Sequence, residues 1–180
     1  MGEKTHFGYS EVDIKRKSSL VGEVFRSVAD RYDLMNDLMS LGVHRHWKRF
    51  AAAQSGLRAG GRALDVAAGS GDMSRLFASQ VGAGGRVVAT DINGAMLERG
   101  RSRLVDAGFI GNVSYALADA EKLSFPDERF DCACIAFGLR NVTRKEQALS
   151  ELCRVVRPGG RLLVLEFSRP LLPILEKAYD

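Results

Sequence analysis

Residues 62–72 read RALDVAAGSGD, and this stretch decides the fold class. The run at 62–67 is apolar and rich in strand-forming residues, and the GSG of 69–71 leads directly into a helical pattern at 72–81. Glycines let a backbone turn tightly, and a helix that begins behind them offers free N–H groups and the positive end of its dipole. The stretch therefore predicts a strand–loop–helix unit that can bind a nucleotide-like ligand.

The chemistry around this loop narrows the ligand. A dinucleotide-binding loop needs a third glycine, and Ser74 stands in its place. No Gly-Lys-Ser/Thr follows, which excludes a P-loop. Asp65 and Asp72 flank the loop, and their charge suits a ligand with a cationic amine and a sulfonium centre better than a pyrophosphate. A simple tight turn remains the alternative for the loop taken alone.

Working outward, strands and helices alternate along the chain. Further strands are expected at 86–90, 113–118, 130–137 and 161–167, and further helices at 95–107 and 143–156. This alternation predicts right-handed crossovers and an α/β fold, a Rossmann-like doubly wound parallel sheet with five strands present.

The residues before the sheet differ from it in pattern. Residues 1–17 look irregular, whereas 18–31 and the pieces within 32–55 have helical spacing. We therefore expect an N-terminal helical segment at 1–55, which forms a lid over the acceptor pocket, and a ligand-binding α/β domain at 56–180.

Two further acids follow the second and third predicted strands. Asp91 ends VVATD, where a carboxylate can accept hydrogen bonds from both ribose hydroxyls, although capping of the next helix is an alternative. Asp119 follows the third strand, where it can meet an adenine edge. The apolar side chains of Met96, Leu97 and Leu123 are expected to sandwich the base. Together with the glycine loop, the acids predict a ligand that contains adenosine with a free ribose.

Composition sets further limits. Apolar residues make up 46% and charged residues 27%, no apolar run is long enough to span a membrane, and the polar N-terminus has no secretory signal. Three cysteines without metal spacing predict a reduced protein, with Cys132 and Cys134 as core residues and no metal. The net charge of +4 permits an anionic partner. Because no aromatic-rich basic patch occurs, we expect no nucleic-acid partner.

Longer motifs resemble a known family. LDVAAGSGD, VVATDINGAML, DAEKLSFPDERFD and RVVRPGGRLLVLEF resemble the successive motifs of class I S-adenosylmethionine (SAM)-dependent methyltransferases. THFGY at 5–9, FRSVADRYDLMNDLMSLGVHRHWKR at 25–49 and IAFGLRNVTRKEQAL at 135–149 closely resemble the ubiquinone/menaquinone biosynthesis C-methyltransferase family. The resemblance runs from Thr5 to Asp180. It also implies that the last two strands of the usual sheet lie beyond this sequence.

The resemblance implies that SAM donates a methyl group to a ring carbon of a polyprenyl benzoquinol or naphthoquinol. The predicted SAM-binding residues are Asp65, Gly69, Ser70, Gly71, Asp91, Ile92, Asp119, Ala120 and Ala136. Ala136 stands where the family usually has a serine. Its missing hydroxyl is expected to weaken SAM binding by about 0.5–1.5 kcal/mol, the contribution of one neutral hydrogen bond.

The predicted catalytic residues are Arg140, Asn141, Tyr32, Asp33 and His44. Arg140 is expected to stabilise developing phenolate charge, and Asn141 to orient a ring oxygen. Asp33 or His44 is the expected proton acceptor, because a guanidinium does not deprotonate. Packing or capping within the lid is the alternative for Tyr32 and His44, and an ordinary surface position is the alternative for Arg140.

The long apolar tail of such a substrate lies in a membrane. We therefore expect peripheral contact with the inner membrane, on the cytoplasmic or mitochondrial matrix side, through the basic N-terminal segment. Self-association and a quinone-biosynthesis complex are further expectations. Two other functions stay open: a SAM-binding or scaffold member of the pathway without activity, and a methyltransferase for another acceptor.

Overall fold

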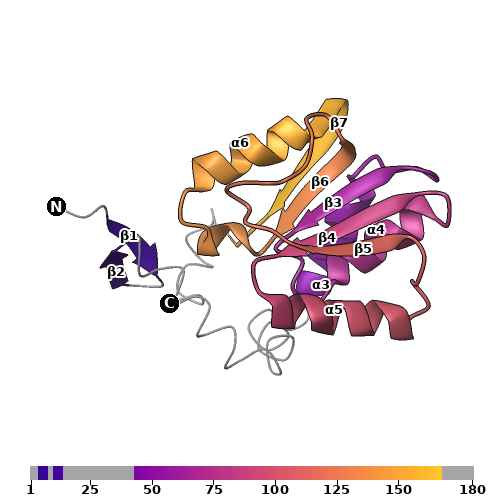
Figure 1. The fold of residues 1–180 in the computed structure, drawn as a ribbon, viewed down its shortest axis with the longest axis horizontal. Coiled ribbons are helices and arrows are strands. Elements are labelled where there is room, and N and C mark those ends of the chain that lie inside the picture. The colour runs from indigo at the N-terminus through magenta and orange to yellow at the C-terminus, as the bar shows by residue number, and fades with distance from the viewer. Residues whose placement is uncertain (1–3, 8–9, 14–42, 168–180) are drawn as a thin grey trace, which may run out of the picture.

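The computed structural model describes residues 4–7, 10–13 and 43–167. Its body is a five-stranded sheet in the order β5-β4-β3-β6-β7, with parallel pairing between all neighbours (Figure 1). The strands are β3 (Arg62–Val66), β4 (Arg86–Asp91), β5 (Val113–Leu117), β6 (Phe130–Ala136) and β7 (Val156–Leu165). Because the chain winds outward from β3 in both directions, the predicted doubly wound sheet is confirmed.

The described helices lie close to their expected positions. They are α3 (Val43–Ala53), α4 (Asp72–Val81), α5 (Gly94–Asp106) and α6 (Lys145–Val155), with a 3₁₀ turn η1 (Leu139–Asn141) after β6. Figure 1 shows α6 beside the β6–β7 end of the sheet and α5 beside β4 and β5. The helix expected at 18–31 and the pieces expected at 32–42 lie outside the described residues.

One strand begins earlier than the sequence predicts. β7 starts at Val156, where the sequence predicts the last residue of a helix, and runs through residues 158–160, where the sequence indicates a turn before the strand expected at 161–167. Val156 pairs with Phe130 before regular pairing resumes between Arg161 and Cys132. The register of the pairing shifts between Phe130 and Cys132, so residues 157–160 lie between the two paired parts of β7. Among them Gly159 has a positive φ of 78°.

Alternating residues of the central strands build a core on each face of the sheet. Cys132 and Cys134 pack with Phe77 of α4 on one face, and Ala133 and Ile135 pack toward α6 on the other. Burial raises the pKa of Cys132 to about 12, so this thiol stays neutral. The prediction that both cysteines are core residues is confirmed.

Helix α3, near the end of the expected N-terminal segment at 1–55, packs against the α/β domain. Ala52 of α3 is 2% exposed and lies in the same apolar cluster as α4. The carbonyl oxygen of Ala52 accepts a hydrogen bond from Gln80 Nε2 at 2.9 Å, and Ser55 Oγ donates to Gln80 Oε1 at 3.0 Å. These contacts hold α3 against α4.

The expectation of irregular structure at 1–17 is wrong in part. β1 (Lys4–Phe7) and β2 (Ser10–Asp13) pair in antiparallel register, with Phe7 opposite Ser10. Two residues separate the strands, and Gly8 is the first of them, which is a hairpin signature. The sequence signal was therefore present, but it spans only four residues on each side.

Candidate active site

The glycine loop joins the end of β3 to the start of α4 through a strained backbone. Ala67 has a φ of 53°, and Gly69 and Gly71 have φ values of 54° and 83°. A positive φ is uncommon for alanine and costs free energy that the surrounding structure must offset. Phe137, at the end of β6, has a φ of 56°, so two neighbouring strands end in the same unusual conformation. Strain of this kind is typical of functional sites.

Helix α5 lies directly against this loop. A Cβ added to Gly100 would stand 2.8 Å from the carbonyl oxygen of Gly69, and one added to Gly71 would stand 2.6 Å from Leu104 Cδ1. Arg103 also donates to the carbonyl oxygen of Ser70 at 3.1 Å. Gly100 is therefore part of the loop's support, and sequence reasoning missed it because a lone glycine in a helix has no local signature.

Asp91 links the end of β4 to the same loop. Its carboxylate accepts hydrogen bonds from the backbone N–H of Gly69 and of Asn93, both at 2.9 Å. Burial raises the pKa of Asp91, although these N–H groups lower it. Asn93 caps α5, since its side chain accepts from the N–H groups of Ala95 and Met96. The capping alternative for Asp91 is thus wrong, and its carboxylate stays at the carboxyl edge of the sheet.

The apolar side chains near Asp91 differ from those expected. Met96, Leu97 and Leu123 are all buried, so they pack in the core instead of lining an open site. Ile92 and Leu117 are 67% and 68% exposed, and Leu117 pairs in register with Asp91 across β4 and β5. Sequence reasoning did not single out Leu117, because the alternation of apolar and polar residues along a strand does not show which end of the strand is exposed.

The predicted residues after β5 lie at the same edge. Asp119 is exposed, and its Oδ1 accepts a hydrogen bond from the N–H of Glu121 at 2.9 Å. Ala120 is half-buried beside it, and Ala136 is half-buried at the end of β6. The structure therefore gathers the predicted cofactor residues along the carboxyl ends of β3, β4, β5 and β6.

The two acids that flank the glycine loop differ in burial, in bonding partners and in the direction of their pKa shifts. Asp65 is 1% exposed and accepts a hydrogen bond from Ser74 Oγ at 2.6 Å, and burial raises its pKa to about 7. Asp72 pairs with Lys48 at 2.8 Å and with Arg103 at 3.2 Å. Burial alone would raise the pKa of Asp72, but these cations lower it. The expectation that both acids present free charge to a ligand is therefore wrong, because Asp65 is buried and Asp72 is paired with two cations.

An aromatic cluster lies beside the predicted acceptor residues. The ring of Phe167 stacks on Phe137, with centroids 4.6 Å apart, and meets Trp47 of α3 edge-on at 5.8 Å. We call Trp47, Phe137 and Phe167 the aromatic cluster. The guanidinium of Arg140 lies 5.3 Å from the centroid of Phe167. Flat apolar rings beside a guanidinium form a surface that suits an aromatic acceptor.

Arg140 is paired, which the sequence did not show. Its guanidinium forms an ion pair with Glu166, and its backbone N–H donates to the other carboxylate oxygen at 3.1 Å. Asn141 lies in the same 3₁₀ turn and donates its N–H to the carbonyl oxygen of Gly138 at 3.0 Å. Glu166 lies in the strand expected at 161–167 and in the motif RVVRPGGRLLVLEF, but neither pattern indicates its pairing with Arg140.

The remaining predicted catalytic residues are distributed as follows. His44 is 4% exposed in the first turn of α3, and it lies near enough to Asp72 to lower the pKa of that carboxyl. Tyr32 and Asp33 lie outside the described residues. Within the described part of the chain, no group of three His, Cys, Asp or Glu side chains is placed to hold a metal ion.

Known structures share this architecture. A putative methyltransferase from Bacillus halodurans is 29% identical, with a TM-score of 0.64 over 73% of this chain and 55% of that one. A SAM-dependent methyltransferase from Aquifex aeolicus is 21% identical and shares the fold, with a TM-score of 0.60 over 90% of this chain and 77% of that one. The fold and the loops at its carboxyl edge define a class I SAM-dependent methyltransferase.

The family follows from the sequence comparisons. The model of the ubiE/COQ5 methyltransferase family matches residues 13–180. The ubiquinone/menaquinone biosynthesis C-methyltransferase of Hahella chejuensis is 58% identical over 99% of this chain and 72% of that protein. Its counterpart in Pseudomonas paraeruginosa is 59% identical over 98% of this chain and 69% of that protein. The chain belongs to the ubiE/COQ5 methyltransferase family.

The contact between α5 and the glycine loop predicts the effect of Gly100→Ala. Alanine favours a helix by about 1 kcal/mol over glycine, but here its Cβ would overlap the Gly69 carbonyl oxygen. We expect a net destabilisation of about 1–2 kcal/mol, which lowers Tm by about 2–8 °C. Gly94→Ala is the matched control, because a Cβ there meets only Leu117 Cδ2 at 3.6 Å. Equal thermal shifts for the two variants would contradict the close contact.

The raised pKa of Asp65 predicts a pH-dependent stability. The pKa of Asp65 is about 7 in the folded chain against the ordinary aspartate value of 3.8, so the unfolded chain loses its proton first and the free energy of unfolding falls as pH rises between these values. Asp65→Asn does not titrate. Its free energy of unfolding relative to wild type should therefore rise with pH by up to about 1.4 kcal/mol per unit, and stay constant above about pH 7.

Urea unfolding at steps of about one unit between about pH 5 and 8 measures this difference. Ser74→Ala removes the hydroxyl that donates to Asp65, so it should extend the dependence to higher pH. A constant difference between Asp65→Asn and wild type over this range would show that Asp65 ionises normally.

Proposed function

We propose that this chain transfers a methyl group from SAM to a ring carbon of a polyprenyl quinol. As a family member about 60% identical to the C-methyltransferases of ubiquinone and menaquinone biosynthesis, it is a C-methyltransferase of that pathway. The observation that carries the proposal at the level of residues is the 2.9 Å hydrogen bond from Gly69 N–H to Asp91. This bond holds Asp91, the acid that we propose to bind the ribose, beside the glycine loop, which supports the proposal.

The described residues fit SAM along the carboxyl edge of the sheet. Asp91 has carboxylate lone pairs left for ribose hydroxyls, and Asp119 stands one strand further on for the adenine edge. We assign the exposed side chains of Ile92 and Leu117 to the faces of the base. Bound SAM supplies an electrophilic methyl group on its sulfonium.

The proposed acceptor site lies beside α3 and the end of β6, at the aromatic cluster and Arg140. The flat rings are proposed to hold the quinol ring, and Asn141 to orient one of its oxygens. Glu166 fixes the guanidinium of Arg140 through an ion pair, so that its N–H groups can stabilise developing phenolate charge. Asp33 or His44 is the proposed proton acceptor, and His44 is buried near Asp72.

Helix α3 supports the proposal of peripheral membrane contact. None of the described helices is long and apolar enough to cross a membrane. On α3, Val43, Trp47 and Phe50 follow helical spacing and are 42%, 39% and 69% exposed. Arg45 and Arg49 are exposed on the same helix, which contains no acid. An apolar stripe with basic flanks suits an anionic membrane interface, where a polyprenyl tail would lie.

This contact is proposed on the cytoplasmic or matrix side of the inner membrane, with 1–55 as the lid over the acceptor. Self-association and a quinone-biosynthesis complex remain proposals for its assembly. A SAM-binding member without turnover is the second candidate function, and Ala136 at the end of β6 is the observation that favours it. Measurement of methyl transfer distinguishes these two candidate functions.

Titration calorimetry with SAM, followed by transfer of labelled methyl to a short-tailed demethylated quinol, tests the function. We expect SAM binding and transfer in the wild-type chain. Arg140→Ala should lower kcat by about a hundredfold or more, because it removes charge stabilisation in the transition state, while SAM affinity changes little. Binding without transfer in the wild type would favour the second candidate function.

Flotation with liposomes tests the membrane proposal. We expect the chain to float with vesicles that contain anionic lipid at low salt, and binding to fall as salt rises, because screening weakens the basic contacts. Phe50→Ser removes the most exposed apolar side chain of α3 and should reduce flotation severalfold. Ile110→Ser is the control, since Ile110 is 75% exposed but lies beyond α5. Equal losses for the two variants would contradict a role for α3.

A further inference from the structure

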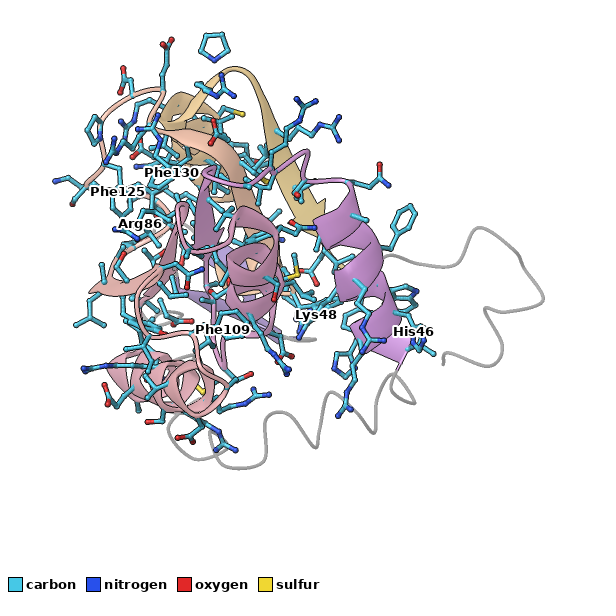
Figure 2. The ribbon with its side chains drawn as sticks, turned by 90° about the vertical axis from the view of Figure 1, so that its right-hand side faces the viewer. His46, Lys48, Arg86, Phe109, Phe125 and Phe130 are labelled. Carbon is cyan, nitrogen blue, oxygen red and sulfur yellow. The ribbon has the colours of Figure 1, made fainter. Side chains whose placement is uncertain are left out.

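Lys48 brings a cation from α3 to the glycine loop. Its Nζ donates to Asp72 Oδ2 at 2.8 Å, and it stands 5.9 Å from the ring centroid of Phe137. Asp72 begins α4 and Phe137 follows β6, so the ammonium lies between the two elements that border the loop. Figure 2 shows Lys48 extending from α3 toward the body of the domain, whereas His46 points away from it. The side chain of Lys48 is 13% exposed.

Two cations share one carboxylate beside the loop. Asp72 receives Lys48 on one oxygen and Arg103 on the other. The other acids near the loop are engaged elsewhere, because Asp65 is buried and bonded to Ser74, and Asp91 accepts from the N–H groups of Gly69 and Asn93. Among the described residues, Lys48 therefore has only a shared carboxylate as its ion-pair partner. A partly buried cation in such surroundings favours the arrival of an anionic group.

The proposed cofactor carries an anion at the corresponding end. Asp91 and Asp119 place the adenosine over β4 and β5, so the methionine end extends past the glycine loop toward β3 and β6. That end bears one ammonium and one carboxylate. We propose that Lys48 binds the methionine carboxylate of SAM, which makes α3 part of the cofactor site. The proposal rests on the proposed function only in that it takes SAM as the ligand.

A purely structural role makes a different prediction. If Lys48 only fastens α3 to α4 through Asp72, its loss should weaken every ligand of the loop alike. If it binds the carboxylate, its loss should weaken only ligands that have one. Decarboxylated SAM keeps the adenosine, the sulfonium and the amine, so it separates the two roles.

Titration calorimetry of the wild-type chain and of Lys48→Met with both ligands is the test. Methionine keeps the apolar length of the side chain and removes its charge. We expect Lys48→Met to lower the affinity for SAM about ten- to a hundredfold, the range for a hydrogen bond between charged groups, and to change that for decarboxylated SAM less than about twofold. Equal losses for the two ligands, or no loss for SAM, would overturn the proposal.

Two further variants guard against a folding defect. Lys48→Arg keeps the charge and should recover most of the selectivity for SAM over decarboxylated SAM. Asp72→Asn removes the partner of Lys48 but leaves the ammonium, so selectivity should persist; if Asp72→Asn abolishes it as Lys48→Met does, Lys48 acts only through Asp72. A wild-type chain that binds neither ligand contradicts both proposals, whereas one that prefers SAM without transferring methyl contradicts the proposed turnover alone.

Discussion

The hydrogen bond from Gly69 N–H to the carboxylate of Asp91 joins the two parts of the chain on which the site depends. It connects the loop after β3 to the end of β4, and α5 presses on the same loop at Gly100. Because the Gly69 carbonyl oxygen and Gly100 are in near contact, the loop cannot move toward α5. The residue after the strained Ala67 is fixed to β4, because the N–H of Ala68 donates to the carbonyl oxygen of Thr90 at 2.9 Å. These contacts fix the backbone of the loop, which reduces the cost of ordering it when the proposed cofactor binds.

Charge pairing ties the helices around that loop together. Asp72 receives cations from α3 and from α5, so three helices meet at one carboxylate. The pairs are partly exposed, and each contributes modestly to stability on its own. Their larger effect is positional, because they keep Lys48 and Arg103 beside the loop. An electrostatic environment for the ligand therefore comes from residues that lie far apart in the sequence.

The proposed acceptor site depends on different interactions. In the aromatic cluster Phe137 is buried beneath Phe167, while Trp47 is partly exposed, and Glu166 pairs with Arg140 beside these rings. Pairing with Glu166 offsets part of the charge of Arg140, so the guanidinium acts through directed N–H groups more than through net charge. Trp47 belongs both to this cluster and to the exposed face of α3. One helix therefore connects the proposed membrane contact, the acceptor surface and the cofactor loop.

The sequence by itself determined the sheet, the glycine loop and the acids after β4 and β5, because each depends on residues close together in the chain. Strand alternation, helical spacing and the conformational freedom of glycine act over ten residues or fewer. The family motifs identified the chemistry in the same way. Only the tertiary structure decided that Asp72 is neutralised, that Asp91 bonds the loop while Asn93 caps α5, and that Arg140 is held by Glu166. These pairings join residues as many as 31 positions apart, and the approach of such residues depends on how helices pack on the sheet, which no local pattern specifies.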